Sequence, residues 1–223
     1  SIQEAIEPIC ARFGADYCLG RAREGGFPHD FHRAFVDDGW LGICIPEAYG
    51  GSGLGIAAAA RMMQTISASG AGMSGASALH MNIFGLNPVV VFGTEEQKRR
   101  MLPPLIRGED KACFGVTAGL NTLKLRTRAQ RRGDHYVVSG QKIWISTAQV
   151  ATKMLLLART TPIEEVTQPT AGLSLFYTDL DRAHVEVREI DKMGRKSVDS
   201  NQVFIDGLIV PLEDRIGEEG CGF

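Results

Sequence analysis

The sequence predicts an α+β protein of more than one domain. An all-α helical domain at residues 1–110 should precede an antiparallel, β-barrel-like domain at residues 111–223. Two observations lead to this prediction. Before residue 110, apolar residues recur at the three- and four-residue spacing of amphipathic helices. After it, short β-like runs follow one another between glycine-containing turns without helices between them, which favours antiparallel pairing over βαβ units.

The helical part contains four apolar segments with helical spacing. They cover residues 2–13, 31–40, 54–69 and 77–92. The last is apolar nearly all round, as expected for a buried helix. A fifth helix should begin at Thr94, because Thr94 and Gln97 form a capping box. We expect it to stop near Pro103 and Pro104, because proline has no backbone donor to continue a helix.

The β part contains eight candidate strands. They cover residues 112–116, 123–128, 136–139, 142–146, 154–158, 173–177, 185–187 and 202–205. Glycine turns at Gly133, Gly140 and Gly207 separate several of them. Strands this close together, without helices between them, predict an antiparallel sheet rather than βαβ units.

Composition excludes several classes of protein. With 44% hydrophobic and 22% charged residues, the 223-residue chain is neither disordered nor fibrous. A net charge of -2 argues against a dedicated nucleic-acid or membrane-surface protein. The longest uninterrupted apolar runs, residues 56–60 and 154–158, are too short to span a bilayer. The five cysteines are widely spaced and odd in number, so we expect reduced thiols and no metal site; His29 and His32 are expected at the surface.

Three charged or glycine-rich motifs have simple structural interpretations. The glycine-rich residues 50–55 lack the third glycine of a dinucleotide loop, which would fall at Ile56, so a flexible loop leading into a helix is expected. A basic cluster could bind phosphate, but a solvated strand face is the favoured interpretation. Its members are Lys124, Arg126, Arg128, Arg131 and Arg132. The acidic pairs at residues 164–165 and 218–219 are expected to face solvent, with no catalytic role.

Two β segments are more informative, because each ends in a hydroxyl residue. The first runs from Cys113 to Thr117, and the second from Gly140 to Ser146. In the second, Trp144 and Ser146 are two apart and therefore share a strand face. A large aromatic beside a hydroxyl suits a flat heteroaromatic ligand. From the residues alone, a core tryptophan beside an ordinary strand-end serine is the favoured interpretation.

At these residues the chain resembles the acyl-CoA dehydrogenase family, over essentially all of its length. Residues 46–51 resemble the family's P-E-x-Y-G-G loop, and residues 93–98 match its G-T-E-x-Q-K helix start. Residues 140–146 match G-x-K-x-W-I-[ST]. Residues 193–195 and 217–223 resemble later landmarks. The joint order and spacing of these motifs make the resemblance specific.

The resemblance implies a fold and a site. Members of the family enclose FAD between an N-terminal helical domain, a middle β domain and a C-terminal four-helix bundle. A carboxylate removes the α proton of an acyl thioester while the β hydrogen leaves as hydride to flavin N5. Trp144 would pack on the flavin and Ser146 would donate toward N5, while the helix at residues 77–92 would line the acyl cavity. The implied cofactor contacts are Phe114, Val116, Thr117, Gly119, Trp144, Ile145 and Ser146.

Two departures from the family pattern affect these expectations. The family's E-x-x triplet is missing after Thr117, and Leu120 and Asn121 replace its [ST]-D pair. Leu120 lacks the hydroxyl expected near the ligand phosphates. The C-terminal bundle, which carries the family's catalytic base, is not present in this chain. No catalytic residue is therefore named here, and residues 1–223 alone are expected to be inactive.

The resemblance implies FAD-dependent α,β-dehydrogenation of an acyl-CoA in fatty acid metabolism, with electrons passed to an electron-transferring flavoprotein. It also implies a soluble homodimer or homotetramer, in the bacterial cytoplasm or the mitochondrial matrix, with no nucleic-acid partner and no membrane span. Two alternatives remain open. One is an acyl-CoA oxidase or flavin monooxygenase of the same fold, and the other is a non-catalytic half-subunit that needs a partner chain.

Overall fold

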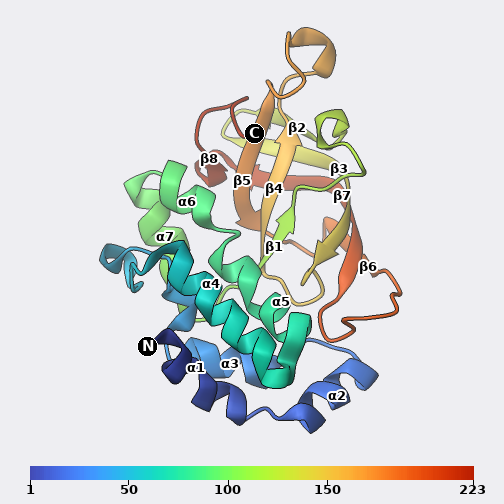
Figure 1. Ribbon diagram of the computed structural model, residues 1–223. Coiled ribbons are helices and arrows are strands. Elements are labelled where there is room, and N and C mark those ends of the chain that lie inside the picture. Colours follow the sequence, from blue (N-terminus) through green and yellow to red (C-terminus); the bar gives the residue numbers. More distant parts are fainter.

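The computed structural model describes residues 1–223, and seven α-helices form its N-terminal part (Figure 1). Their bounds are α1 Ile2–Ala11, α2 Ala15–Glu24, α3 His29–Asp37, α4 Gly55–Ile66, α5 Gly72–Ile83, α6 Asn87–Phe92 and α7 Glu95–Ile106. Helix α1 begins with a capping box between Ser1 and Glu4, and it packs its buried face, including Ile6 and Ile9, against α4. The sequence signal at Thr94 is confirmed: its hydroxyl accepts from Gln97 N at 3.2 Å.

The helices differ from the prediction at three places. Helix α2 was missed because none of its residues is buried, so no apolar stripe marks it. The expected helix at residues 77–92 is two helices, because Pro88 cannot continue α5 and instead lies in the first turn of α6. Helix α7 continues through Pro103 and Pro104, since burial of Leu105 in the core favours one more turn.

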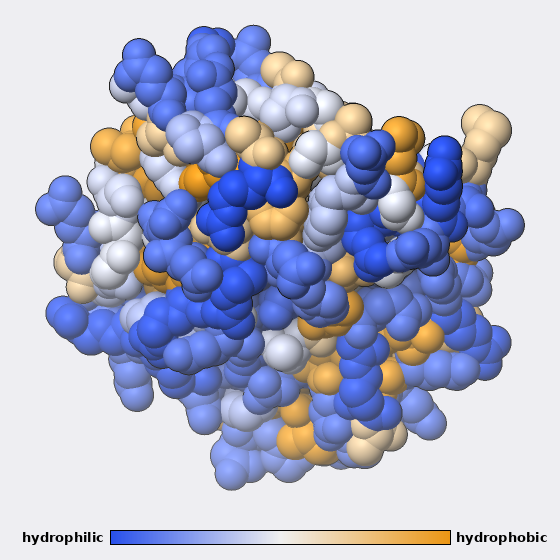
Figure 2. Space-filling model, turned by 90° about the horizontal axis from the view of Figure 1, so that it is seen from below, coloured by the Kyte–Doolittle hydropathy of each residue, from blue (hydrophilic) through white to orange (hydrophobic).

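By length and composition alone, the helical stretch Gly55–Phe92 could cross a membrane. In the structure it is not one helix. A five-residue π-helical turn at Ser67–Ala71 separates α4 from α5, with Gly70 at φ 99°. Buried residues of both helices, such as Met62 and Leu79, belong to the core of the helical part. Seen from below, the molecule is mostly hydrophilic and its apolar side chains form small separate patches (Figure 2).

The C-terminal part is one eight-stranded sheet (Figure 1). Its strands are β1 Ala112–Gly115, β2 Arg128–Arg132, β3 His135–Ser146, β4 Lys153–Arg159, β5 Leu173–Asp179, β6 Val185–Glu189, β7 Ser200–Pro211 and β8 Arg215–Ile216. The order is β6-β7-β3-β2-β4-β5-β8, with β1 pairing β4. The predicted helical domain followed by a mostly antiparallel β domain is confirmed. The sheet is not closed into a barrel, because β6 and β8 end it on either side, and β1 pairs with β4 in parallel.

Two strand assignments change. The expected strands at 136–139 and 142–146 form one long strand, β3, whose pairing with β7 shifts register at Gly140 and again before Ile145. The expected strand at 123–128 is a 3₁₀ turn, Thr122–Lys124, followed by irregular chain and then β2. The Asn121 side chain accepts from Leu123 N at 3.0 Å, which favours the turn. Exposed and buried residues nevertheless alternate from Lys124 to Gln130.

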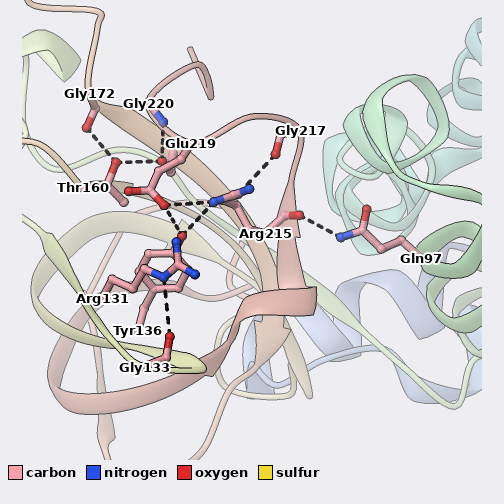
Figure 3. A network of polar contacts seen from close by, with 11 residues as sticks. Gln97, Arg131, Gly133, Tyr136, Thr160, Gly172, Arg215, Gly217, Glu219 and Gly220 are labelled. Atoms are coloured by element: carbon pink, nitrogen blue, oxygen red, sulfur yellow. Dashed lines mark hydrogen bonds and ion pairs between the residues drawn. The ribbon is translucent and has the colours of Figure 1, made fainter.

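The two parts share a core and a polar seam. One apolar cluster combines α7 residues such as Leu102 with β-sheet residues such as Leu157 and Ile216. Gln97 of α7 donates to the carbonyl of Arg215 at 2.7 Å, and the Arg215 guanidinium in turn contacts Glu219 at 2.9 Å (Figure 3). These contacts fix the C-terminal segment against the helices.

His32 corrects another prediction, because it is buried rather than at the surface. Asn82 Nδ2 lies 3.4 Å from the Nε2 of His32, and the side-chain oxygen Oδ1 of Asn82 accepts from Ala112 N at 2.9 Å. Burial lowers the pKa of His32 to about 3. The imidazole is therefore a neutral core group that connects α3 to α5 and, through Asn82, to β1. His29 is exposed, as predicted.

Candidate functional site

The two β segments that the sequence identified lie beside each other. Strand β1 runs parallel to β4, and the chain beyond its end turns toward β3. There the backbone nitrogen of Ile143 donates to the carbonyl of Thr117 at 3.0 Å. This bond places the hydroxyl-ended segment at Thr117 directly against the part of β3 that carries Trp144 and Ser146.

A buried lysine fixes this junction from inside the sheet. Lys142 is 1% exposed, and its Nζ donates to the carbonyls of Leu157 at 2.6 Å and Val116 at 3.2 Å. It forms no ion pair with a carboxylate, and burial lowers its pKa to about 7. The ammonium therefore ties the end of the β1 segment to β4, and through its own backbone it ties both to β3.

The backbone at Trp144 is strained. Its φ is 62°, which is an outlier for a bulky residue, and the register of β3 against β7 shifts between Lys142 and Ile145. The result is that the indole is 57% exposed while Ile145, the next residue, is 1% exposed. Phe114 on β1 is also partly exposed, at 37%. An exposed aromatic face on strained backbone is typical of a ligand-binding position.

Ser146, at the end of β3, belongs to a polar bridge between the two parts of the chain. The guanidinium of Arg195 donates to the hydroxyl oxygen of Ser146 at 3.1 Å and to that of Ser77, on α5, also at 3.1 Å. Because arginine only donates, the proton of each hydroxyl stays free for another acceptor. The bridge places a positive charge beside the predicted cofactor serine.

A cavity of about 350 Å³ opens on the α5 side of this bridge. Its lining includes Met63, Met73, Ser77, His80 and Arg195. The pKa of His80 is lowered, first by burial and also by the charge of Arg195, so the imidazole is a neutral wall of the cavity. A mixed apolar and polar space of this kind suits a small acyl group.

The remaining predicted residues lie around the junction with different exposures. The Val116 side chain packs on the shared core cluster, and that of Ile145 is buried, so each would offer only backbone groups to a ligand. The Ile145 carbonyl already accepts from Asn201 Nδ2 at 2.8 Å. Gly119 has φ 143°, a conformation for which glycine is suited. Leu120, beside it, is fully exposed.

Sequence reasoning missed Lys142 and Arg195 as parts of this site. Lys142 lies within the motif at residues 140–146. The signal that could have identified it is a charged residue at a position where the alternation of a strand predicts a buried side chain. Arg195 follows a glycine in a loop, and no local pattern connects it to Ser146, which lies 49 residues away. Only the tertiary fold brings these residues together.

Comparison with known proteins agrees with this architecture. The family description "Acyl-CoA dehydrogenase, N-terminal domain" matches residues 1–109, and "Acyl-CoA dehydrogenase, middle domain" matches residues 113–208. A 3-(aryl)acrylate reductase of Clostridium sporogenes is 29% identical over 225 residues, which is 99% of this chain and 56% of that protein. The chain spans about half the length of the curated relatives that it matches.

Solved structures give the same result. A probable acyl-CoA dehydrogenase from Mycobacterium abscessus superposes with a TM-score of 0.91 at 30% identity, covering 100% of this chain and 59% of that one. A chain from a structure of the electron transferring flavoprotein of Acidaminococcus fermentans superposes with a TM-score of 0.91 at 27% identity, covering 100% and 58%. With both domain descriptions matched in order and the fold shared over its full length, the chain belongs to the acyl-CoA dehydrogenase family.

Proposed function

We propose that this chain supplies the flavin-binding and substrate-cavity parts of an FAD-dependent enzyme that oxidises an acyl-CoA thioester between its α and β carbons. The observation that carries the proposal is the exposed indole of Trp144 beside the Thr117 segment and the Ser146 hydroxyl. The proposed cofactor contacts are Phe114, Val116, Thr117, Gly119, Trp144, Ile145 and Ser146.

The residues at this junction fit a flavin. A tricyclic ring needs a flat apolar surface and donors at its edge, and Trp144 and Ser146 provide one of each. The Ser146 proton is free because Arg195 donates to its oxygen. When bound, FAD supplies the acceptor for the hydride that leaves the β carbon. A hydroxyl and a guanidinium at this point would stabilise the negative charge that develops beside them.

The substrate would lie between α5 and the sheet. The cavity beside Ser77 and His80 offers room for an acyl group, and the neutral His80 adds no charge that would repel an apolar chain. The bridge from Arg195 to Ser77 and Ser146 fixes α5 relative to β3, which holds the walls of the reacting space at a set separation. We place the base that removes the α proton outside these 223 residues, so this chain alone should not catalyse the oxidation of an acyl-CoA.

The partner for the electrons is proposed to be an electron-transferring flavoprotein, and the working form a homodimer or homotetramer. The similarity to a chain from an electron transferring flavoprotein structure supports the first of these. An oxidase or monooxygenase would use O₂ instead. In the complete enzyme, which includes the part that supplies the base, anaerobic bleaching by an acyl-CoA, followed by slow reoxidation in air and fast reoxidation by the flavoprotein, distinguishes the dehydrogenase from both.

The flavin site is tested by Trp144→Ala. The substitution removes the flat apolar surface on which the flavin ring would pack, so FAD retention should be weaker. Phe92→Ala is the matched control, because Phe92 is an exposed aromatic on α6, 66% exposed against 57%. FAD content after gel filtration, read from the visible spectrum, should fall for Trp144→Ala alone. Equal FAD content in the two variants would contradict the site.

A further inference from the structure

We propose that a basic cavity at the far end of the sheet binds an organic polyphosphate, a nucleotide-sized ligand with at least two phosphate groups. This site does not depend on the flavin site. The basic cavity lies between β2, the segment before it and the loop that joins β4 to β5. Its cationic lining consists of Lys124, Arg126, Arg128, Arg131, Arg132 and Arg159.

The volume of the basic cavity indicates more than a single small ion. It measures about 950 Å³, which is nearly three times the cavity beside Arg195. The carboxylate in its lining is Glu164, on the loop. Six positive charges facing one negative charge leave a large excess of positive potential in one concave space. Anions would be concentrated there, and a ligand with several negative charges would benefit most.

These cations lie together without carboxylate partners. Several other surface arginines do pair with nearby carboxylates, as Arg21 does with Glu24, Arg107 with Glu109 and Arg188 with Glu186. No cation of the basic cavity forms an ion pair. Arg131 and Arg132 only reach a carbonyl and an amide oxygen, each at 3.4 Å. Like charges gathered without partners repel each other, so this arrangement costs stability unless an anion binds between them.

Arg159 gives a second, independent indication of a ligand. The residue is 6% exposed, and its terminal nitrogens donate to the carbonyls of Pro169 at 2.9 Å and Ala171 at 3.0 Å. Its Nε is buried and has no partner. A buried donor without an acceptor is costly, and in a cavity wall it is available to a ligand oxygen. The carbonyls hold the guanidinium in place while this donor stays free.

Neighbouring cations alternate with buried residues along the segment before β2, which suits a chain of phosphates. Lys124, Arg126 and Arg128 are exposed, and the residues between them are buried. The three cations therefore lie on the solvent side of the segment, although it is a 3₁₀ turn and irregular chain up to the start of β2. Separate phosphate groups of one ligand could therefore each meet a different cation. Arginine forks bind phosphate oxygens in pairs, which adds orientation to charge.

The same ligand chemistry has two sources, a free nucleotide or the nucleotide end of coenzyme A. Arg128 pairs with Ser139 of β3, five residues before Trp144. Along a strand this is about 17 Å. An extended pantetheine arm covers a comparable distance, so one coenzyme A molecule could reach both regions.

The test measures binding of adenosine 3′,5′-bisphosphate to the full chain by isothermal titration calorimetry, with adenosine as the uncharged comparison. The bisphosphate should bind and adenosine should not. Arg128→Ser should weaken binding about tenfold, the effect of losing one charge-assisted hydrogen bond. Arg23→Ser, which removes an exposed charge on α2, should leave binding unchanged.

A second pair of variants tests for tighter binding, which a misfolded protein would not show. Glu164→Gln removes the negative charge in the lining and should tighten binding about threefold. Glu165→Gln, at the next residue but outside the lining, should have a smaller effect. The proposal is overturned if the bisphosphate does not bind, or if Arg128→Ser and Arg23→Ser behave alike.

Competition identifies the source. If coenzyme A displaces the bisphosphate and pantetheine does not, the basic cavity holds the nucleotide end of the thioester carrier. If ATP displaces it and coenzyme A does not, the cavity is a separate nucleotide site. Both outcomes support a polyphosphate site. Displacement by chloride at the same ionic strength as effectively as by either nucleotide would show an adventitious ion only, and would refute it.

Discussion

Replacing Lys142 by methionine should change how stability depends on pH. Methionine keeps the length and apolar stem of lysine but has no proton to titrate. In the folded protein, burial lowers the pKa of Lys142 from its ordinary 10.5 to about 7. In the unfolded chain the ammonium is in water and the ordinary value applies. The two states therefore bind this proton over different pH ranges.

The direction and size of the effect follow from this difference. Between pH 7 and 10.5 the unfolded chain holds the proton and the folded one has released it, so stability rises with pH. Below pH 7 both states hold the proton, and the contribution becomes constant. Each pH unit inside the window corresponds to about 1.4 kcal/mol. Allowing for partial titration near pH 7, the wild type should gain about 2 kcal/mol between pH 7 and pH 9, relative to Lys142→Met.

Urea unfolding followed by circular dichroism at pH 7, 8 and 9 measures this difference. Other titrating groups are common to both proteins, so their contributions cancel in the comparison. Lys196→Met is the control, because Lys196 is exposed, and it should follow the wild type. Parallel stability curves for wild type and Lys142→Met would refute the reasoning, since they would mean that Lys142 keeps its proton equally in both states.

Two further predictions concern acid stability and backbone packing. The pKa of His32 is about 3 in the folded protein and 6.5 ordinarily, so the free energy of unfolding falls as the pH falls from 6.5 toward 3. Between pH 7 and 5, the wild type should lose about 2 kcal/mol more than His32→Gln in urea unfolding. Equal acid sensitivity of the two proteins would contradict a buried neutral imidazole. A Cβ added at Gly51 would lie 2.0 Å from the carbonyl oxygen of Ile45, whereas one at Gly14 meets nothing within 4 Å. Gly51→Ala should therefore lower the thermal midpoint by several degrees and Gly14→Ala should leave it nearly unchanged, as differential scanning calorimetry can check; similar midpoints would mean that the loop can move aside.

Local sequence signals predicted those parts of the fold that depend on local physics. The capping box at Thr94 and Gln97 forms because both hydrogen bonds lie within one turn. Helix α2 has no fully buried residue, so its existence depends on propensity and on the elements around it. The turn at Thr122–Lys124 depends on one side-chain contact from Asn121 that competes with strand pairing.

The candidate site was predictable to the extent that it lies in contiguous motifs. Trp144 and Ser146 occur in one such run, and Thr117 ends another. What brings the runs together is a set of distant contacts, the Thr117–Ile143 hydrogen bond and the buried ammonium of Lys142. The basic cluster illustrates the same limit. Its alternation along the chain was visible, but Arg159 and the loop that make it concave come from later in the sequence.

Two costly features occur almost consecutively on β3, and they have a common explanation. A buried ammonium without a carboxylate at Lys142 loses solvation, and a left-handed tryptophan at Trp144 costs about 1–3 kcal/mol. Neither is needed for β3 to pair in the open sheet, because residues 135–139 pair with β2 and the pairing with β7 continues on both sides of the register shift. Both instead fix geometry: the ammonium holds the chain beside Thr117, and the bulge turns the indole outward. A sheet that gives up stability at two neighbouring positions to present one aromatic face is better explained by binding than by folding.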